Sequence, residues 1–212
     1  MELTGITAAP AAKRTDDPCA GKRLAGRPRS DATRGAILRA AYELLSEGGL
    51  RNFTIEGVAA RSGVARTTIY RWWPSRGALA MDGFLETTAP HITFPHTQSA
   101  TADLRVQMRL CAKLLRGPAG RILCGIIAEG QNDPETIAVF SERYLTSRRR
   151  EAAAILQRGI DTGEFRPHLD IQATQSAIYS SLHLRLLLRE PIDDSWVERL
   201  ADSVLRGCVA TS

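Results

Sequence analysis

Hydrophobic residues recur at helical spacing between residues 53 and 79 and predict two short helices that meet at a tight corner. Ile55, Val58 and Ala59 fall on one face of the first helix. Gly63 stands at the corner, where glycine can adopt the left-handed backbone conformation that such a turn needs. The pattern predicts a helix-turn-helix.

The second helix of this pair is polar on the side that faces away from its apolar anchors, Val64 and Ile69. Its outer side chains combine hydrogen-bond donors, methyl groups and positive charge, which suit base edges and phosphates in a major groove. We therefore expect double-stranded DNA as a partner, contacted by Arg66, Thr67, Thr68, Tyr70 and Arg71.

Flanking helices complete a domain that we place at residues 30–88. The first follows Ser30, a candidate N-cap, and ends at Gly48 and Gly49. A helix from about Arg76 to Thr87 follows the Trp73-Pro74 break and leads out of the domain. Trp73 itself is expected in the core.

Helical patterns continue beyond a proline-containing break at residues 88–100. They predict an all-α chain with a second helical domain at residues 89–212. We expect its helices near residues 101–116, 118–130, 134–160, 170–189 and 194–209.

Composition and charge agree with this organisation. Of the 212 residues, 43% are apolar and only 6% aromatic, which favours packed helices. The net charge is +5, and the first 76 residues, with 13 Lys and Arg against 7 Asp and Glu, carry a balance of +6. Positive charge therefore accompanies the helix-turn-helix. Residues 1–29 predict a disordered basic arm that either lies along DNA or only solubilises the chain.

Other chemistry is sparse. The four cysteines form no C-x-x-C pair, and no apolar run approaches the length of a membrane span. We expect a cytoplasmic protein with no membrane contact, metal or cofactor. Cys111 and Cys124 fall on apolar faces and indicate buried thiols, with a redox sensor as the alternative. No phosphate-binding loop or nucleophile motif indicates an enzyme.

Three segments, Ala36–Leu50, Phe53–Val64 and Thr68–Leu79, agree in spacing and residue type with one known pattern. Residues 30–85 resemble the DNA-binding domain of the TetR family of bacterial transcriptional regulators. The second half is similar to the family's helical ligand-binding and dimerisation domain in helix count and length. The resemblance implies a regulator, commonly a repressor, that leaves a palindromic operator when a small molecule binds.

The resemblance also implies roles for single residues. Thr54 and Thr68 would bind phosphate oxygens, and Arg76 would clamp another phosphate. Bases or the adjacent backbone would be approached by Arg66, Thr67 and Tyr70. For the two arginines, the alternative is a solvated surface charge.

Two positions depart from the family pattern. Ala65 stands where a serine commonly caps the recognition helix and contacts phosphate, so the cap should be weaker. Trp72 stands where a basic residue or histidine is usual, and its indole offers a single N–H donor.

The last two predicted helices carry apolar residues three and four positions apart. Packed as an antiparallel pair, they would form half of a four-helix homodimer interface, as in the family, with an intramolecular core as the alternative. This stripe consists of Ile178, Leu182, Leu186, Trp196, Leu200 and Val204.

A pocket for an apolar or aromatic small-molecule effector is expected among the middle helices. Its candidate lining, for which an ordinary core is the alternative, is Met108, Cys111, Leu115, Cys124, Ile127, Phe140 and Tyr144. A DNA-binding architectural protein or an activator without ligand control remains the alternative function.

Overall fold

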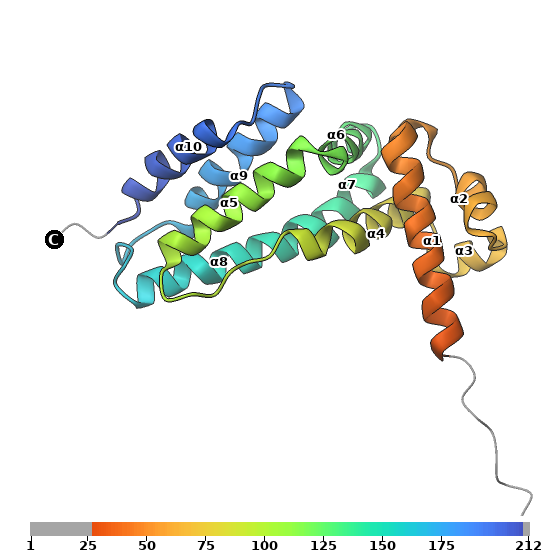
Figure 1. The fold of residues 1–212 in the computed structure, drawn as a ribbon, viewed down its shortest axis with the longest axis horizontal. Helices are drawn as coiled ribbons and strands as arrows, with labels where there is room; N and C mark the ends of the chain where they lie inside the picture. Colours follow the sequence, from red (N-terminus) through yellow and green to blue (C-terminus); the bar gives the residue numbers. More distant parts are fainter. Residues whose placement is uncertain (1–26, 210–212) are drawn as a thin grey trace, which may run out of the picture.

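Helices form almost all of the chain between residues 27 and 209, which this computed structural model describes, with side chains from Ser30 onward. Figure 1 shows a small group of helices at one end of an elongated molecule. We call this group the head; it contains α1 (Arg27–Gly48), a 3-10 turn (Leu50–Asn52), α2 (Ile55–Ser62) and α3 (Arg66–Trp72).

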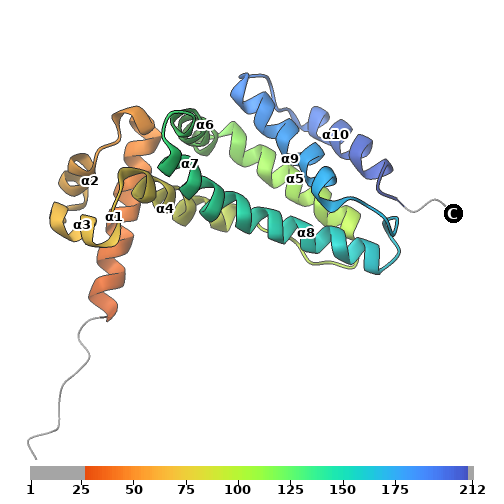
Figure 2. The same cartoon turned by 180° about the vertical axis from the view of Figure 1, so that it is seen from behind.

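The connecting helix α4 (Arg76–Thr88) leads from the head into a larger helical body. After a short turn, η2 (Ala89–His91), the body contains α5 (Ala100–Arg116), α6 (Pro118–Gly130), α7 (Pro134–Phe140), a π-helical turn η3 (Ser141–Leu145), α8 (Thr146–Asp161), α9 (Ile171–Leu187) and α10 (Asp194–Arg206). In Figures 1 and 2, α8 runs along the length of the body, and α10 lies on the side of the body opposite α8. Helices α6 and α7 contact α1 and α4, which joins the body to the head.

Side-chain caps begin several of these helices. Thr54 Oγ1 accepts a hydrogen bond from the Gly57 amide at 3.0 Å, and Ser75 accepts one from Ala78 at 3.2 Å. The predicted corner is confirmed, because Gly63 has a φ of 69° in the left-handed region. Ala65 gives α3 no side-chain cap, as its methyl group predicted.

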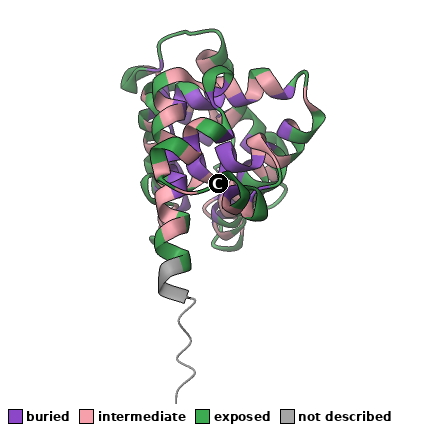
Figure 3. Ribbon diagram, turned by 90° about the vertical axis from the view of Figure 1, so that its right-hand side faces the viewer, coloured by how far each residue is buried: buried purple, intermediate pink, exposed green. Residues whose placement is uncertain are grey.

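Buried side chains hold the head and body together from within. Viewed along the long axis, buried positions face inward between the helices and exposed positions lie outside (Figure 3). The head core includes Ile37, Phe53, Val58 and Trp73, which confirms the expectation for the tryptophan. A Cβ on Gly83 would approach Ala41 Cβ to 2.9 Å, so this glycine permits close packing of α4 on α1.

Several element boundaries differ from the sequence expectation. Helix α1 begins at Arg27, before Ser30, and so includes the last residues of the predicted arm. The rest of that arm, residues 1–26, lies outside the described residues. The last two helices end at Leu187 and Arg206, each a few residues early.

The helix expected at residues 134–160 is interrupted by the π-helical turn η3. Both the backbone N–H and the hydroxyl of Thr146 donate to the carbonyl oxygen of Ser141, five residues earlier. Such a turn inserts an extra residue and rotates the side chains that follow it. Within it, Tyr144 stacks on Phe140 with ring centroids 5.4 Å apart.

Candidate nucleic-acid interface and internal cavity

Helix α3 is anchored on one side and open to solvent on the other. Ile69 is buried beneath the helix, and Trp73 is buried directly after it. The structure places the predicted DNA-contacting residues on the outer side, with Arg66, Thr67 and Arg71 exposed and Tyr70 50% exposed. Thr68 and Trp72 are partly buried at the edges of this face. Thr54, at the start of α2, is exposed beside it.

Arg66 has an acidic neighbour on α2. Its guanidinium lies 3.1 Å from Glu56 Oε1, and both side chains are well exposed. The pKa of Glu56 is lowered by a hydrogen bond from its own backbone N–H and by the hydrogen bond from Arg66. Because ion pairs between exposed side chains contribute little to stability, Arg66 can exchange this partner for DNA at small cost.

Arg76, the predicted phosphate clamp, borders the same surface hollow as Thr54 and Tyr70, and it also has partners within the protein. Its guanidinium is 2.7 Å from Glu129 Oε1 on α6, and it also approaches the carbonyl oxygens of Leu50 and Phe53 at 3.5 Å. The side chain is therefore engaged between head and body. The motif alone cannot reveal this contact, because Glu129 is far away in the sequence.

A second polar contact links the recognition helix to the body. The indole N–H of Trp73 donates to Asp82 Oδ2 on α4 at 2.8 Å. Arg143, in the π-helical turn, forms an ion pair with the other carboxylate oxygen of Asp82. Asp82 thus bridges the end of α3 and the π-helical turn η3.

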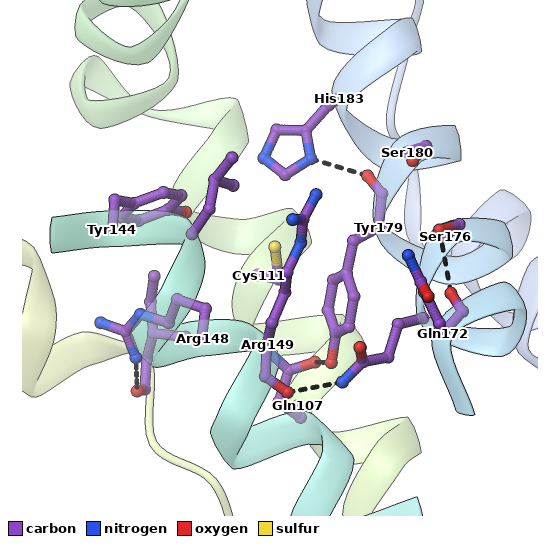
Figure 4. Close-up of a pocket in the computed structure, with 13 residues that line it drawn as sticks. Gln107, Cys111, Tyr144, Arg148, Arg149, Gln172, Ser176, Tyr179, Ser180 and His183 are labelled. Atoms are coloured by element: carbon purple, nitrogen blue, oxygen red, sulfur yellow. Dashed lines mark hydrogen bonds between the residues drawn. The ribbon is translucent and has the colours of Figure 1, made fainter. Parts of the chain in front are cut away.

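The body contains a cavity of about 340 Å³ between α5, α8 and α9 (Figure 4). It is lined by Ile92, Gln107, Cys111, Tyr144, Leu145, Arg148, Arg149, Gln172, Gln175, Ser176, Tyr179, Ser180 and His183. Many of these side chains are polar, and two are arginines. The lining is therefore less apolar than the sequence suggested.

Only Cys111 and Tyr144 of the seven predicted lining residues face this cavity. Met108, Leu115 and Phe140 are buried in the core. Cys124 borders a separate hollow. Ile127, together with Phe140, borders a more open hollow that shares Arg149 and His183 with the cavity. The prediction selected apolar positions, which are the residues that helices use to contact one another.

Polar residues of the cavity were missed, although one carried a usable signal. Gln107 is only 2% exposed and lies on the buried face of α5, between Leu104 and Cys111. Its Oε1 accepts a hydrogen bond from the Tyr179 hydroxyl at 2.6 Å. An amide on an otherwise apolar helix face indicates a buried polar partner or a ligand.

Burial controls the protonation of the cavity. It raises the pKa of the Cys111 thiol to about 12, against a smaller opposing effect of Arg148, and it also raises the pKa of Tyr179. It lowers the pKa of His183, although a hydrogen bond to the Tyr179 carbonyl opposes this. The thiol is therefore protonated and a poor nucleophile, which disfavours the redox-sensor alternative.

The predicted dimer stripe needs correction on α9. Ile178 and Leu182 are 0% exposed, because this side of α9 packs inside its own subunit. The exposed apolar residues of this region lie on another face, at Leu184 (57%) and Leu188 (60%), with Leu187 beside them. The remaining stripe residues are partly buried: Leu186 at the end of α9, and Trp196, Leu200 and Val204 on α10.

Comparison with known proteins gives two family matches that follow the two parts of the fold. "Bacterial regulatory proteins, tetR family" matches residues 37–81, and "Tetracyclin repressor-like, C-terminal domain" matches residues 94–204. The HTH-type transcriptional regulator YdeS of Bacillus subtilis is 36% identical over 188 residues, 88% of this chain and 95% of YdeS. The chain belongs to the TetR family.

Two further relatives agree with this family membership. The crystal structure of the TetR family regulator SCO0332 is 37% identical, with a TM-score of 0.74 over 84% of this chain and 99% of that one. The repressor TetR of Mycobacteroides abscessus is 28% identical over 184 residues, 84% of this chain and 94% of the repressor. The protein is thus a helix-turn-helix transcriptional regulator, and the predicted all-α fold with its two parts is confirmed.

Two negative findings concern the described residues alone. None of the helices there has the length and apolar character needed to cross a membrane. Within the same residues, His, Cys, Asp and Glu side chains do not gather into a group that could hold a metal ion.

Proposed function

We propose that the protein is a cytoplasmic homodimeric repressor that binds a palindromic operator and releases it when a small molecule occupies the body cavity. The observation that carries this proposal is the position of the π-helical turn. It contributes Tyr144 to the cavity wall and Arg143 to the ion pair with Asp82, which also holds Trp73 at the end of α3.

Helix α3 supports the DNA-binding part of the proposal. Its exposed face offers donors and positive charge, and its buried side is rigidly anchored. We assign the operator contacts to Thr54, Ala65, Arg66, Thr67, Thr68, Tyr70, Arg71 and Trp72, with Ala65 acting through its backbone only. Arg76 is reassigned to the link between head and body.

An exposed apolar group at the end of α9 supports a dimer and, through it, a palindromic operator. Leu184, Leu187 and Leu188 form an exposed apolar group on one side of the body, continuous in sequence with the partly buried Leu186. Monomeric proteins rarely leave such a group uncovered. A two-fold pair through this face would present two copies of α3 to two half-sites.

Operator release requires a path from the cavity to the head. Tyr144 contacts Phe84 of α4 edge to face, with ring centroids 5.7 Å apart. A ligand that displaces Tyr144 would therefore move Phe84 of α4 directly. It would also move the neighbouring Arg143, which pairs with Asp82 of the same helix. Coupling of this kind amounts to about 1–3 kcal/mol, or roughly 5- to 150-fold in affinity.

Selection of bound duplexes from a random pool tests the proposal. We expect a recovered palindrome, reduced transcription from a promoter that carries it, and higher expression when the effector is added. Equal binding of unrelated duplexes would instead indicate an architectural protein. Increased transcription, with no response to any ligand, would indicate an activator without ligand control.

A further inference from the structure

Two guanidinium groups line the cavity, and no carboxylate is among its lining residues. Arg148 donates one hydrogen bond to the Ile92 carbonyl oxygen at 2.8 Å and lies 6.0 Å from the Tyr144 ring centroid. The side chain of Arg149 makes no contact with an acidic residue among the described side chains, and in Figure 4 its guanidinium points toward His183. The cavity therefore has positive charge that no carboxylate of the described residues neutralises, and it opens to solvent at Arg149, which is exposed.

His183 adds a hydrogen-bond acceptor on the side toward which Arg149 points. Its Nδ1 lies 2.7 Å from the Tyr179 carbonyl oxygen, which only accepts hydrogen bonds, so Nδ1 carries the proton. Burial lowers the pKa of the ring and keeps it neutral. Nε2 is then a bare acceptor, and it is buried without a partner in the protein. An unmet buried acceptor is costly, so this position calls for a donor.

Two other polar side chains of the wall, Tyr179 and Gln175, already have hydrogen-bond partners in the protein. Tyr179 donates to Gln107, and Gln175 Nε2 donates to the Arg149 carbonyl oxygen at 2.5 Å. Tyr144 and Tyr179 lie on opposite sides of the cavity, with the Cys111 thiol between them (Figure 4). Two aromatic walls suit a flat ring.

We propose that the effector is an aromatic carboxylate that also carries a hydroxyl group. Arg149 binds the carboxylate, the hydroxyl donates to His183 Nε2, and the ring lies between Tyr144 and Tyr179. This assignment rests on the proposed function and replaces the purely apolar effector expected from the sequence. It follows because one cavity contains both guanidinium groups without a carboxylate partner and a buried acceptor, His183 Nε2, without a donor.

Calorimetric titration of the full chain without DNA tests this ligand class. The probes are para-hydroxybenzoate, para-hydroxyphenylacetate and para-hydroxycinnamate, each with its primary amide and its methyl ether. At least one acid should bind with a Kd below about 1 mM, and its amide should bind about tenfold or more weakly because a charge-assisted contact is lost. The methyl ether, which cannot donate to His183, should also bind more weakly.

Three variants assign these preferences to residues. Arg149→Ala should remove the preference for acid over amide, and His183→Phe should remove the preference for hydroxyl over ether. Arg150→Ala is the matched control, because this exposed neighbour does not line the cavity and should leave both preferences intact.

Three results would overturn the ligand class: amides that bind as tightly as acids, no acid that binds below about 1 mM, or equal losses in the Arg149 and Arg150 variants. None of these results depends on DNA. A recovered operator with a failed probe set would leave the repressor proposal standing, whereas acid binding without any operator would reject the repressor proposal and keep the ligand class.

Discussion

Trp73 and Asp82 are joined by a hydrogen bond of 2.8 Å from the indole N–H to Oδ2. Trp73 directly follows the recognition helix, and Asp82 lies on the connecting helix α4. Because Arg143 of the body pairs with the other oxygen of the same carboxylate, one side chain connects all three elements. The position of α3 therefore depends on a contact that the body also controls.

Replacing Asp82 tests this connection. Asp82→Asn removes the charge that holds Arg143 and weakens the acceptor for Trp73, so we expect a loss of about 1.5–3 kcal/mol in the free energy of unfolding. We also expect weaker operator binding, measured by titration. Asp202→Asn, which breaks a 2.5 Å ion pair with Arg105 far from the head, is the control. Equal losses of operator affinity in both variants would contradict the connection.

Arg66 and Arg76 should behave differently on DNA. Arg66→Ala should cost about 1–3 kcal/mol on the selected operator and relax discrimination there, if it pairs with a guanine. Arg76→Ala should leave the salt slope of log K unchanged, if its guanidinium stays bound to Glu129 in the complex. A lost phosphate contact would instead reduce the slope by about 0.9.

Glu129→Ala provides the matched partner for the Arg76 experiment. If the two residues act as a pair, the double variant should lose no more stability than either single variant, as measured by urea unfolding. A reduced salt slope in Arg76→Ala alone, with Glu129→Ala unaffected, would restore the phosphate role.

The exposed leucines predict the oligomeric state. Leu184→Glu combined with Leu188→Glu should give a folded monomer that fails to bind the operator, since both side chains are exposed in the single subunit. Light scattering and circular dichroism measure the two properties. Leu182→Glu should instead unfold the chain, because it places a charge at a fully buried site. A wild-type monomer at micromolar concentration would refute the interface.

Asp103 should make the stability depend on acidic pH. Burial of this carboxyl, which is 1% exposed, raises its pKa. Hydrogen bonds from Thr97 and the ion pair with Arg158 lower the pKa by more, so the net value lies below the ordinary 3.8. The stabilisation is therefore complete above about pH 3.8 and is lost as the pH falls through the folded value. Asp103→Asn should cost about 3 kcal/mol at neutral pH, because it leaves Arg158 without its charge partner.

Urea unfolding between pH 3 and pH 7 measures this dependence. The Asn variant should lose stability less steeply toward acid than the wild type, while Asp202→Asn, at a more exposed carboxyl, should follow the wild-type curve closely. Parallel curves for wild type and Asp103→Asn would show that another group causes the acid sensitivity.

The recognition helix was predictable because its signals are local. Thr54, Gly63, Ile69 and Trp73 set the cap, the corner and the anchors within about twenty residues of chain, and backbone geometry makes their consequences nearly independent of distant packing. The family resemblance in the same segment then identified the residues of the outer face.

The tertiary structure alone decided the chemistry of the body. Sequence spacing placed Ile178 and Leu182 on one face of α9, but the same spacing occurs in dimer interfaces and in the cores of single subunits. Only the helices packed against α9 determine that this face belongs to the core. Arg76 meets Glu129, and Arg149 reaches His183, only after folding brings separate helices together. A cavity is likewise the space that several helices leave between them, so no single segment of the sequence encodes its polarity.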